Sequence, residues 1–233
     1  MSEKVKFTID GKECFAEKGQ SILDAAADNG VFIPSLCHMR DVIPAGSCRI
    51  CNVKVAGRNM TACTTPVEQG MDVENNSEEL NDLRKAIVEM LFVEGNHFCP
   101  ACEKSGNCEL QALAYRFQMM IPRFPYEFRV KKPDPDTPKI WVEKNRCILC
   151  KRCIRAFKTE DGKNLTDYKK RGHKLEINID HELAAKLTDE EAQRLMEICP
   201  VGSLIKKGKG FNEPIGSRKF DKNAIGSDIE KVV

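Results

Sequence analysis

The sequence lacks the features of a secreted, membrane-spanning or nucleic-acid-binding protein. Its 233 residues contain no apolar run of membrane-spanning length. The N-terminus, MSEKVKFTIDG, enters an alternating pattern without the apolar core of a secretory signal. Charge is balanced, with 37 Lys and Arg against 35 Asp and Glu and a net charge of +2. These absences predict a cytoplasmic protein with no membrane span and no nucleic-acid partner.

The sequence also lacks nucleotide-binding motifs. No G-x-G-x-x-G follows a predicted strand and no P-loop is present, so a flavin or nicotinamide site is not expected in this chain. Cysteine, by contrast, is abundant, with 12 residues. A chain of this length can fold without disulfides, and in a reducing compartment clustered cysteines are more often metal ligands. The cysteines therefore predict metal sites.

One group of cysteines has the spacing C-x2-C-x2-C followed by a remote Cys-Pro, which is the bacterial ferredoxin pattern with its last ligand displaced. Cysteines at every third residue can supply three corners of a cubane cluster, and the remote cysteine closes the cage. A zinc ribbon is disfavoured because it normally uses two separate C-x2-C pairs. The predicted [4Fe-4S] ligands are Cys147, Cys150, Cys153 and Cys199.

An earlier group has a close C-x2-C pair with one remote cysteine on each side, similar to the plant-type [2Fe-2S] arrangement with altered spacers. Its predicted ligands are Cys37, Cys48, Cys51 and Cys63. A hairpin about Asp10-Gly11, a helix opened by Ser21 and short strands at 52–55 and 58–62 predict a β-grasp ferredoxin domain around it. A zinc site is the alternative here.

The remaining group, C-x2-C-x5-C, has only three cysteines, although a four-coordinate cluster site needs a fourth ligand or an open position. These cysteines are Cys99, Cys102 and Cys108. His97 is the nearest candidate, and with eleven cysteines it would complete three four-ligand sites. The group then holds a second [4Fe-4S] cluster. The alternatives for the fourth ligand are His38, Cys14 and an iron without a protein ligand.

The pattern between the motifs predicts an α+β protein in five parts. An amphipathic helix follows Ser77, with Leu80, Leu83, Ile87, Met90 and Leu91 as its packing stripe, a second helix covers 109–119, and a Thr188 to Glu191 capping box opens the helix that delivers Cys199. The predicted parts are 1–77, the β-grasp 2Fe-2S domain; 78–121, a short helical 4Fe-4S domain with one histidine and three cysteine ligands; 122–138, a Pro-rich linker; 139–207, a ferredoxin-like 4Fe-4S domain; and 208–233, a C-terminal arm. The arm is expected to bind a partner or to be a loose tail.

The segment from Lys144 to Lys174 is strongly basic, with eleven Lys or Arg against three Asp or Glu. Two interpretations stay open. The charges offset an anionic cluster and dock an acidic partner, or they form an ordinary solvated face.

The motifs also carry a family resemblance. The order of the first group, the segment "CEKSGNCELQ" and the segment "CILCKRCIRAF…CPVGSL" resembles the N-terminal part of the large iron-sulfur subunit of respiratory NADH dehydrogenase and of [FeFe] hydrogenases. The whole chain, ending "GSRKFDKNAIGSDIE", is most similar to the small diaphorase (gamma) subunits of NAD-reducing [NiFe] hydrogenases. In the wider family the histidine usually stands four residues before the first cysteine of its group, where this chain has Gly95.

The resemblance implies an electron-transfer subunit of a hydrogen:NAD⁺ oxidoreductase, with no catalytic residues or active site of its own. It would relay single electrons between a diaphorase partner, which carries FMN and NAD, and the small and large hydrogenase subunits. The [2Fe-2S] centre would lie on the flavin side, the Cys147 cluster in the middle and the His97/Cys99 cluster on the hydrogenase side. The alternatives are the same role in an NAD-linked formate dehydrogenase, [FeFe] hydrogenase or NADH dehydrogenase, and a zinc-binding interaction module.

Overall fold

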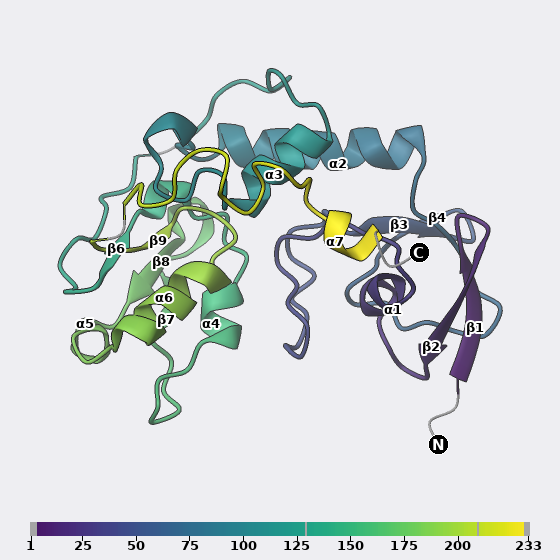
Figure 1. Ribbon diagram of the computed structural model, residues 1–233, viewed down its shortest axis with the longest axis horizontal. Coiled ribbons are helices and arrows are strands. Elements are labelled where there is room, and N and C mark those ends of the chain that lie inside the picture. The colour runs from purple at the N-terminus through teal and green to yellow at the C-terminus, as the bar shows by residue number, and fades with distance from the viewer. Residues whose placement is uncertain (1–3, 129, 209, 231–233) are drawn as a thin grey trace.

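The structure is a computed structural model, and it describes residues 4–128, 130–208 and 210–230. The ends of the predicted N-terminal domain and C-terminal arm, 1–3 and 231–233, lie outside the described residues. Figure 1 shows an elongated molecule with a β-sheet module at one end, a second mixed module at the other, and two helices running along one side between them. Among the described residues, no helix has the length and apolar character needed to cross a membrane.

The first module is a five-stranded sheet in the order β2-β1-β5-β3-β4, with one helix. β1 pairs antiparallel with β2 and parallel with β5. The bounds are β1 (Lys4–Ile9), β2 (Lys12–Glu17), α1 (Ile22–Asp28), β3 (Asn52–Val55), β4 (Arg58–Thr61) and β5 (Asp72–Glu74). Asp10 and Gly11 both have positive φ, as a tight hairpin turn requires. Ser21 caps α1 by accepting a hydrogen bond from the Asp24 amide. The predicted β-grasp topology is therefore observed.

Two helices and a short 3-10 turn follow, namely α2 (Glu78–Val93), η1 (Cys99–Ala101) and α3 (Glu109–Arg116). The predicted apolar stripe of α2 is only partly correct, because Met90 is exposed while Arg84 and Glu89 are buried. The buried face is offset by about one residue from the apolar stripe. It takes in Arg84, which donates to carbonyls of the first module, and Glu89, which pairs with Arg123. The helix predicted over 109–119 ends at Arg116, and Gln118 has a left-handed φ of 50°.

The far module contains two small antiparallel sheets, β6 with β9 and β7 with β8. Its elements, and the helix of the C-terminal arm, are β6 (Ile140–Val142), η2 (Lys144–Arg146), α4 (Arg152–Ala156), β7 (Thr166–Lys169), η3 (Gly172–Lys174), β8 (Glu176–Ile179), α5 (His181–Ala184), α6 (Asp189–Ile198), β9 (Leu204–Lys206) and α7 (Ser227–Glu230). The predicted strand at 140–142 is present. So is the capping box, in which Thr188 and Glu191 each accept a hydrogen bond from the other's backbone amide.

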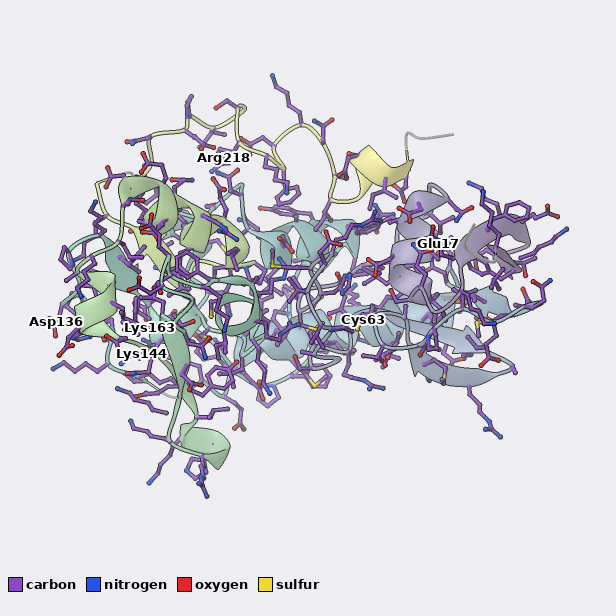
Figure 2. The ribbon with its side chains drawn as sticks, turned by 90° about the horizontal axis from the view of Figure 1, so that it is seen from below. Glu17, Cys63, Asp136, Lys144, Lys163 and Arg218 are labelled. Carbon is purple, nitrogen blue, oxygen red and sulfur yellow. The ribbon has the colours of Figure 1, made fainter. Side chains whose placement is uncertain are left out.

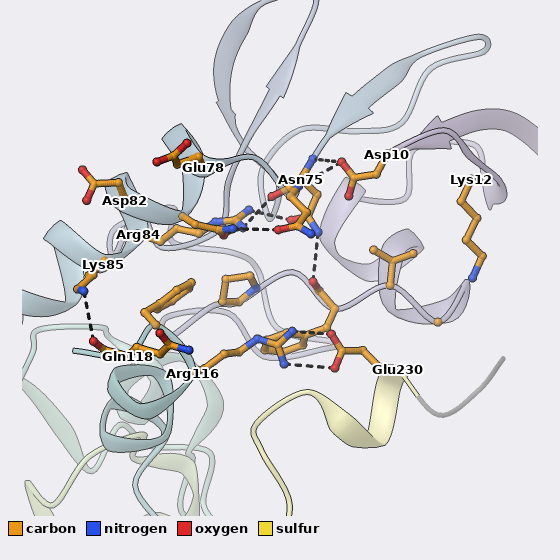
Figure 3. A pocket seen from close by; sticks show the side chains of 17 residues that line it. Asp10, Lys12, Asn75, Glu78, Asp82, Arg84, Lys85, Arg116, Gln118 and Glu230 are labelled. Carbon is orange, nitrogen blue, oxygen red and sulfur yellow. Dashed lines mark hydrogen bonds and ion pairs between the residues drawn. The ribbon is translucent and has the colours of Figure 1, made fainter. Parts of the chain in front are cut away.

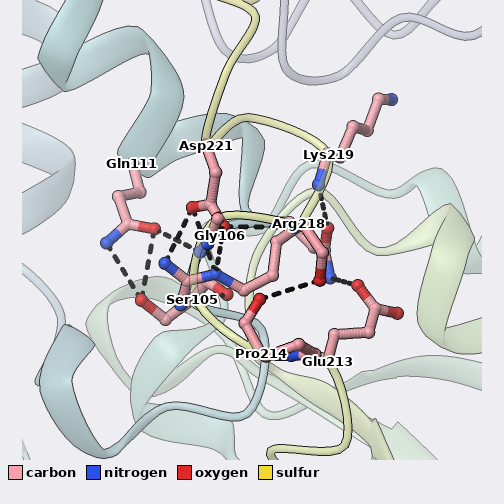
Figure 4. A network of polar contacts seen from close by, with 11 residues as sticks. Ser105, Gly106, Gln111, Glu213, Pro214, Arg218, Lys219 and Asp221 are labelled. Carbon is pink, nitrogen blue, oxygen red and sulfur yellow. Dashed lines mark hydrogen bonds and ion pairs between the residues drawn. The ribbon is translucent and has the colours of Figure 1, made fainter.

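The described part of the C-terminal arm packs against α3 and the loop before it. Figure 4 shows Arg218 beside Asp221, and the Arg218 guanidinium also donates to the Ser105 carbonyl. Further along, Arg116 pairs with Glu230 at 2.5 Å and stacks over the Phe32 ring of the first module. The arm thus runs from the far module back to the first, and its described residues are bonded at both ends of that path.

Arg84 joins α2 to the first module at the edge of a cavity of about 870 Å³ (Figure 3). It is 2% exposed and donates to the carbonyls of Asn52 and Asn75 at 2.7 and 2.8 Å, and to the Asn75 side chain. Burial lowers the pKa of Arg84 to about 10. Its planar, forked guanidinium therefore satisfies backbone acceptors that would otherwise be buried without partners.

We expect Arg84→Met to lower the free energy of unfolding by about 3 kcal/mol, because two buried carbonyls lose their donor. The matched control is Arg58→Met on β4, where the side chain is exposed. Urea unfolding of both variants measures the difference. A loss no larger for Arg84→Met than for Arg58→Met would contradict this role of Arg84.

Candidate metal centres

All 12 cysteines are free thiols, and eleven of them belong to the three ligand groups predicted from their spacing. Figure 2 shows Cys63 of the first group and Lys144, near the third group, in different parts of the molecule. Within the described residues, no three His, Cys, Asp or Glu side chains converge on a point that would hold a single metal ion. In a cubane cluster each thiolate binds a different iron, and in a [2Fe-2S] cluster the four thiolates bind two irons in pairs, so in both cases the thiols are spaced more widely than four ligands of one ion.

The first site lies where the sheet meets its ligand loop. Cys51 directly precedes β3, Cys63 follows β4, and both are 1% exposed. The neighbouring thiols of Cys48 and Cys63 lower the pKa of Cys37. The neighbouring sulfurs of Cys37 and Cys51, and then burial, raise the pKa of Cys63. Four sulfurs are thus brought together.

The third site is an enclosed, mainly apolar cavity lined by all four predicted cysteines, Cys147, Cys150, Cys153 and Cys199. Leu149 and Lys151 have left-handed φ values of 54° and 64°, a strained pair of conformations in a loop that brings three thiols to one cavity. The fourth thiol comes from the C-terminal end of α6. Burial raises the pKa of Cys147 to about 11 and that of Cys153 to about 12, so without a cation these groups are neutral thiols.

The second site has three thiols at a junction between modules. Cys99 begins η1, Cys102 ends it, and the Cys108 sulfur accepts a hydrogen bond from the Gln111 amide at the start of α3. Burial raises the pKa of Cys108 to about 12. A Cβ on Gly202, in the C-P-V-G turn of the far module, would overlap the Cys102 sulfur. The second site therefore packs directly on the segment that carries the last ligand of the third.

The His97 imidazole lies over Gly95 and 5.2 Å from the Phe92 ring. A Cβ at position 95 would come within 2.5 Å of His97 Nε2, so the ring fills the space in which a side chain at 95 would begin. The His97 carbonyl accepts a hydrogen bond from the Cys99 thiol at 3.4 Å, so the backbone of residue 97 lies beside the second site. The ring also lines a cavity with Cys147. Burial, and then Arg146, lower the pKa of His97 to about 4, which keeps the ring neutral and able to bind metal.

The rival fourth ligands have other surroundings. Cys14 is fully buried in the sheet core, opposite Phe7 in the β1–β2 pair, and burial raises its pKa. His38 Nε2 is 2.8 Å from the Asp24 carboxylate and lines a cavity with Cys63 of the first site. Neither side chain is placed with the three thiols of the second site.

Four lysines of the basic segment, together with two from the chain before it, line one cavity of about 490 Å³, in which Glu176 is the only carboxylate among the lining residues described. The lysines that line it are Lys131, Lys132, Lys144, Lys169, Lys170 and Lys174. Lys144 is 6% exposed and its Nζ is 3.9 Å from the Glu176 carboxylate, whose same oxygen also pairs with Lys169 and Lys170. Burial and Lys169 lower the pKa of Lys144. One carboxylate thus serves three ammonium groups, which leaves the cavity positive.

Three protein-family models match successive parts of the chain. A 2Fe-2S iron-sulfur cluster binding domain matches residues 2–78, the NADH-ubiquinone oxidoreductase-G iron-sulfur binding region matches 84–123, and the ferredoxin-like domain of NADH-quinone oxidoreductase subunit 3 matches 137–205. Each match contains one of the three cysteine groups. The chain therefore combines a 2Fe-2S domain with two regions of iron-sulfur type.

Two longer relatives share only part of their length with this chain. The NADPH-Fe(3+) oxidoreductase subunit alpha of Geobacter sulfurreducens is 37% identical over 87% of this chain but 24% of its own. The mitochondrial NADH-ubiquinone oxidoreductase 78 kDa subunit of Neurospora crassa is 33% identical over 89% of this chain and 28% of its own. The chain thus spans about a quarter of these relatives.

Two other proteins match over nearly their whole length. A chain in the crystal structure of an NAD⁺-reducing [NiFe]-hydrogenase in the H2-reduced state superposes with a TM-score of 0.88 at 38% identity, covering 97% of this chain and 98% of that one. The NAD-reducing hydrogenase HoxS subunit gamma of Cupriavidus necator is 46% identical over 95% of both chains. This chain belongs to the family of the gamma subunits of NAD-reducing hydrogenases.

Proposed function

We propose that this chain relays single electrons between a flavin- and NAD(H)-binding diaphorase subunit and a hydrogenase module in an NAD-reducing hydrogenase. The observation that carries the proposal is the presence of three groups of cysteine thiols in a chain that is 46% identical to a gamma subunit of such an enzyme. The chain acts as part of an oxidoreductase complex. FMN and NAD bind to a partner, and hydrogen is activated on the small and large hydrogenase subunits.

The ligand sets of this proposal are those predicted from spacing. Cys37, Cys48, Cys51 and Cys63 hold a [2Fe-2S] cluster, His97, Cys99, Cys102 and Cys108 hold a [4Fe-4S] cluster, and Cys147, Cys150, Cys153 and Cys199 hold another. When bound, such clusters accept and release one electron at a time. The donor chemistry fits, because the thiols are mostly buried, carry no disulfide and lie among apolar side chains. We assign them to the parts 1–77, 78–121 and 139–207.

The spatial order of the sites supports a path in which the Cys147 site lies between the other two. Arg155 of the far module donates to the Cys37 carbonyl, and the Cys102 sulfur packs on Gly202 of the same module. The third site is therefore bonded to the loop of the first and in contact with a ligand of the second. We assign the first site to the flavin side and the second to the hydrogenase side by similarity to the family.

The cavity of about 490 Å³ that is lined by lysines supports docking of an acidic partner beside the third site. Lys131, one of its lining residues, is close enough to Cys147 for its positive charge to oppose the rise that burial causes in the pKa of that thiol. Partner association that weakens steeply with salt would support this assignment, and association independent of salt would favour a solvated face. We place the complex in the cytoplasm, where thiolate ligands stay reduced. If a formate dehydrogenase co-purifies with the chain in place of a hydrogenase, the relay role holds with a different terminal enzyme.

We expect chain purified without oxygen to contain about ten iron atoms with acid-labile sulfide, which matches one two-iron and two four-iron clusters. EPR after reduction should show three distinct centres. Clearly less iron would remove one of the sites. Colourless protein with zinc and no sulfide would contradict the electron-transfer function and favour the zinc-binding alternative.

His97→Cys should retain the second cluster but lower its reduction potential, because a thiolate adds a negative charge where imidazole is neutral. An EPR-monitored redox titration of the full chain measures this shift. His173→Cys, at an exposed histidine of the far module, is the matched control and should change nothing. If His97→Cys leaves both signal and potential unchanged, the fourth ligand is another group.

A further inference from the structure

Helix α4 carries two arginines that flank Cys153 in the sequence Cys150-Lys-Arg-Cys-Ile-Arg155. Each guanidinium group extends from the far module and contacts a segment that carries a predicted ligand of another site. Arginines among cysteines look like ordinary solvated charge in the sequence. In the structure, however, each guanidinium contacts a segment that belongs to another site.

Arg152 joins the third site to the second. Its guanidinium makes a bidentate pair with the Glu109 carboxylate, both N–O distances being 2.7 Å, and the side chain is 6% exposed. Glu109 directly follows Cys108, and Arg152 directly precedes Cys153. A backbone bond from the Glu109 amide to the Pro200 carbonyl, 2.9 Å long, fixes the same junction. Cys108 of the second site and Cys153 of the third are therefore connected through the paired side chains of their sequence neighbours, Glu109 and Arg152.

Arg155 joins the third site to the first. One terminal nitrogen donates to the Cys37 carbonyl at 2.5 Å and to the Cys150 carbonyl at 3.4 Å, and the other donates to the Ile43 carbonyl. The Arg155 guanidinium thus contacts the backbone of one predicted ligand of the first site, Cys37, and of one predicted ligand of the third site, Cys150. Lysine cannot reproduce this, because an ammonium on a flexible stem lacks the planar fork that reaches several fixed acceptors.

We propose that Arg152 and Arg155 are positioning residues that fix the third site against its two neighbours, Arg152 toward the second and Arg155 toward the first. The inference rests on the proposed relay function. It deepens that function by naming what holds the centres at working separation. Since electron transfer and magnetic coupling both depend steeply on separation, loosening one contact should weaken one junction and leave the other intact.

The test uses the full chain, reduced and examined by EPR for spin–spin interaction between centres, and then the assembled complex. Arg155→Gln should weaken the interaction between the first and third centres only. The double variant Arg152→Gln/Glu109→Gln, which avoids leaving a buried carboxylate unpaired, should weaken only that between the second and third. Hydrogen-dependent NAD reduction should fall in each variant, because electron transfer between two centres slows as their separation grows.

Two further variants distinguish the positioning role of Arg155 from the effect of its charge and from a general effect of replacing an arginine in the far module. Arg155→Lys keeps the charge, so the potential of the third centre should stay near that of the native chain while the interaction with the first centre still weakens. Arg171→Gln, at an exposed arginine of the same module, should change neither. Iron and sulfide content, measured for every variant, shows that the centres are retained.

Intact interactions and unchanged turnover in Arg155→Gln and in the double variant, with iron retained, would overturn the role of the arginines and leave the relay function standing. A native chain without iron-sulfur centres would instead overturn the relay function itself. The two failures are therefore distinguishable in the same set of measurements.

Discussion

The Cys37 and Cys150 carbonyls accept hydrogen bonds from the same Arg155 guanidinium, and the arrangement of the whole molecule depends on contacts of this kind. The first module has its own sheet and its own core, so nothing in its topology fixes where it sits relative to the far module. A relay needs centres at fixed separations. The chain meets this need with bonds between the ligand-bearing segments themselves, where any displacement of one centre is felt directly by the next.

The hydrophobic cores also connect the first module to the rest of the molecule. Cys51 and Cys63 belong to the core of the first module, whereas Leu36 and Ile50, which flank the ligand loop, belong to the larger core that α3, α6 and the far sheets share. The first site therefore straddles both cores. Arg84 of α2 and Arg116 of α3, which stacks over the Phe32 ring, add further contacts, so the first module is attached at several points.

The features that could be predicted from the sequence are those that depend on residues close together in the chain. Spacing alone divided eleven cysteines into three predicted ligand sets, and the Asp10-Gly11 turn and the Thr188 capping box depend on residues within four positions. The offset of the buried face of α2 could not be predicted, because Arg84 is buried only where carbonyls of the first module meet it. The path of the C-terminal arm also depends on distant contacts, such as that of Arg218 with Ser105.

Gly95 and Gly202 illustrate the same limit within the candidate sites. Neither position has room for a larger residue, because a predicted ligand, His97 at Gly95 or Cys102 at Gly202, occupies the space beside the Cα. For Gly202 the partner is 100 positions away, so no local pattern marks it. Gly95 is close to its partner, and the altered histidine spacing at 97 is the signal that could have drawn attention to it.

Pulsed EPR on the fully reduced chain, which measures the separation of paramagnetic centres pair by pair, tests the central claim most directly. We predict three centres, with the Cys147 centre interacting strongly with both others and the first and second centres farthest apart. A strong direct interaction between the first and second centres, with the Cys147 centre remote from both, would contradict it.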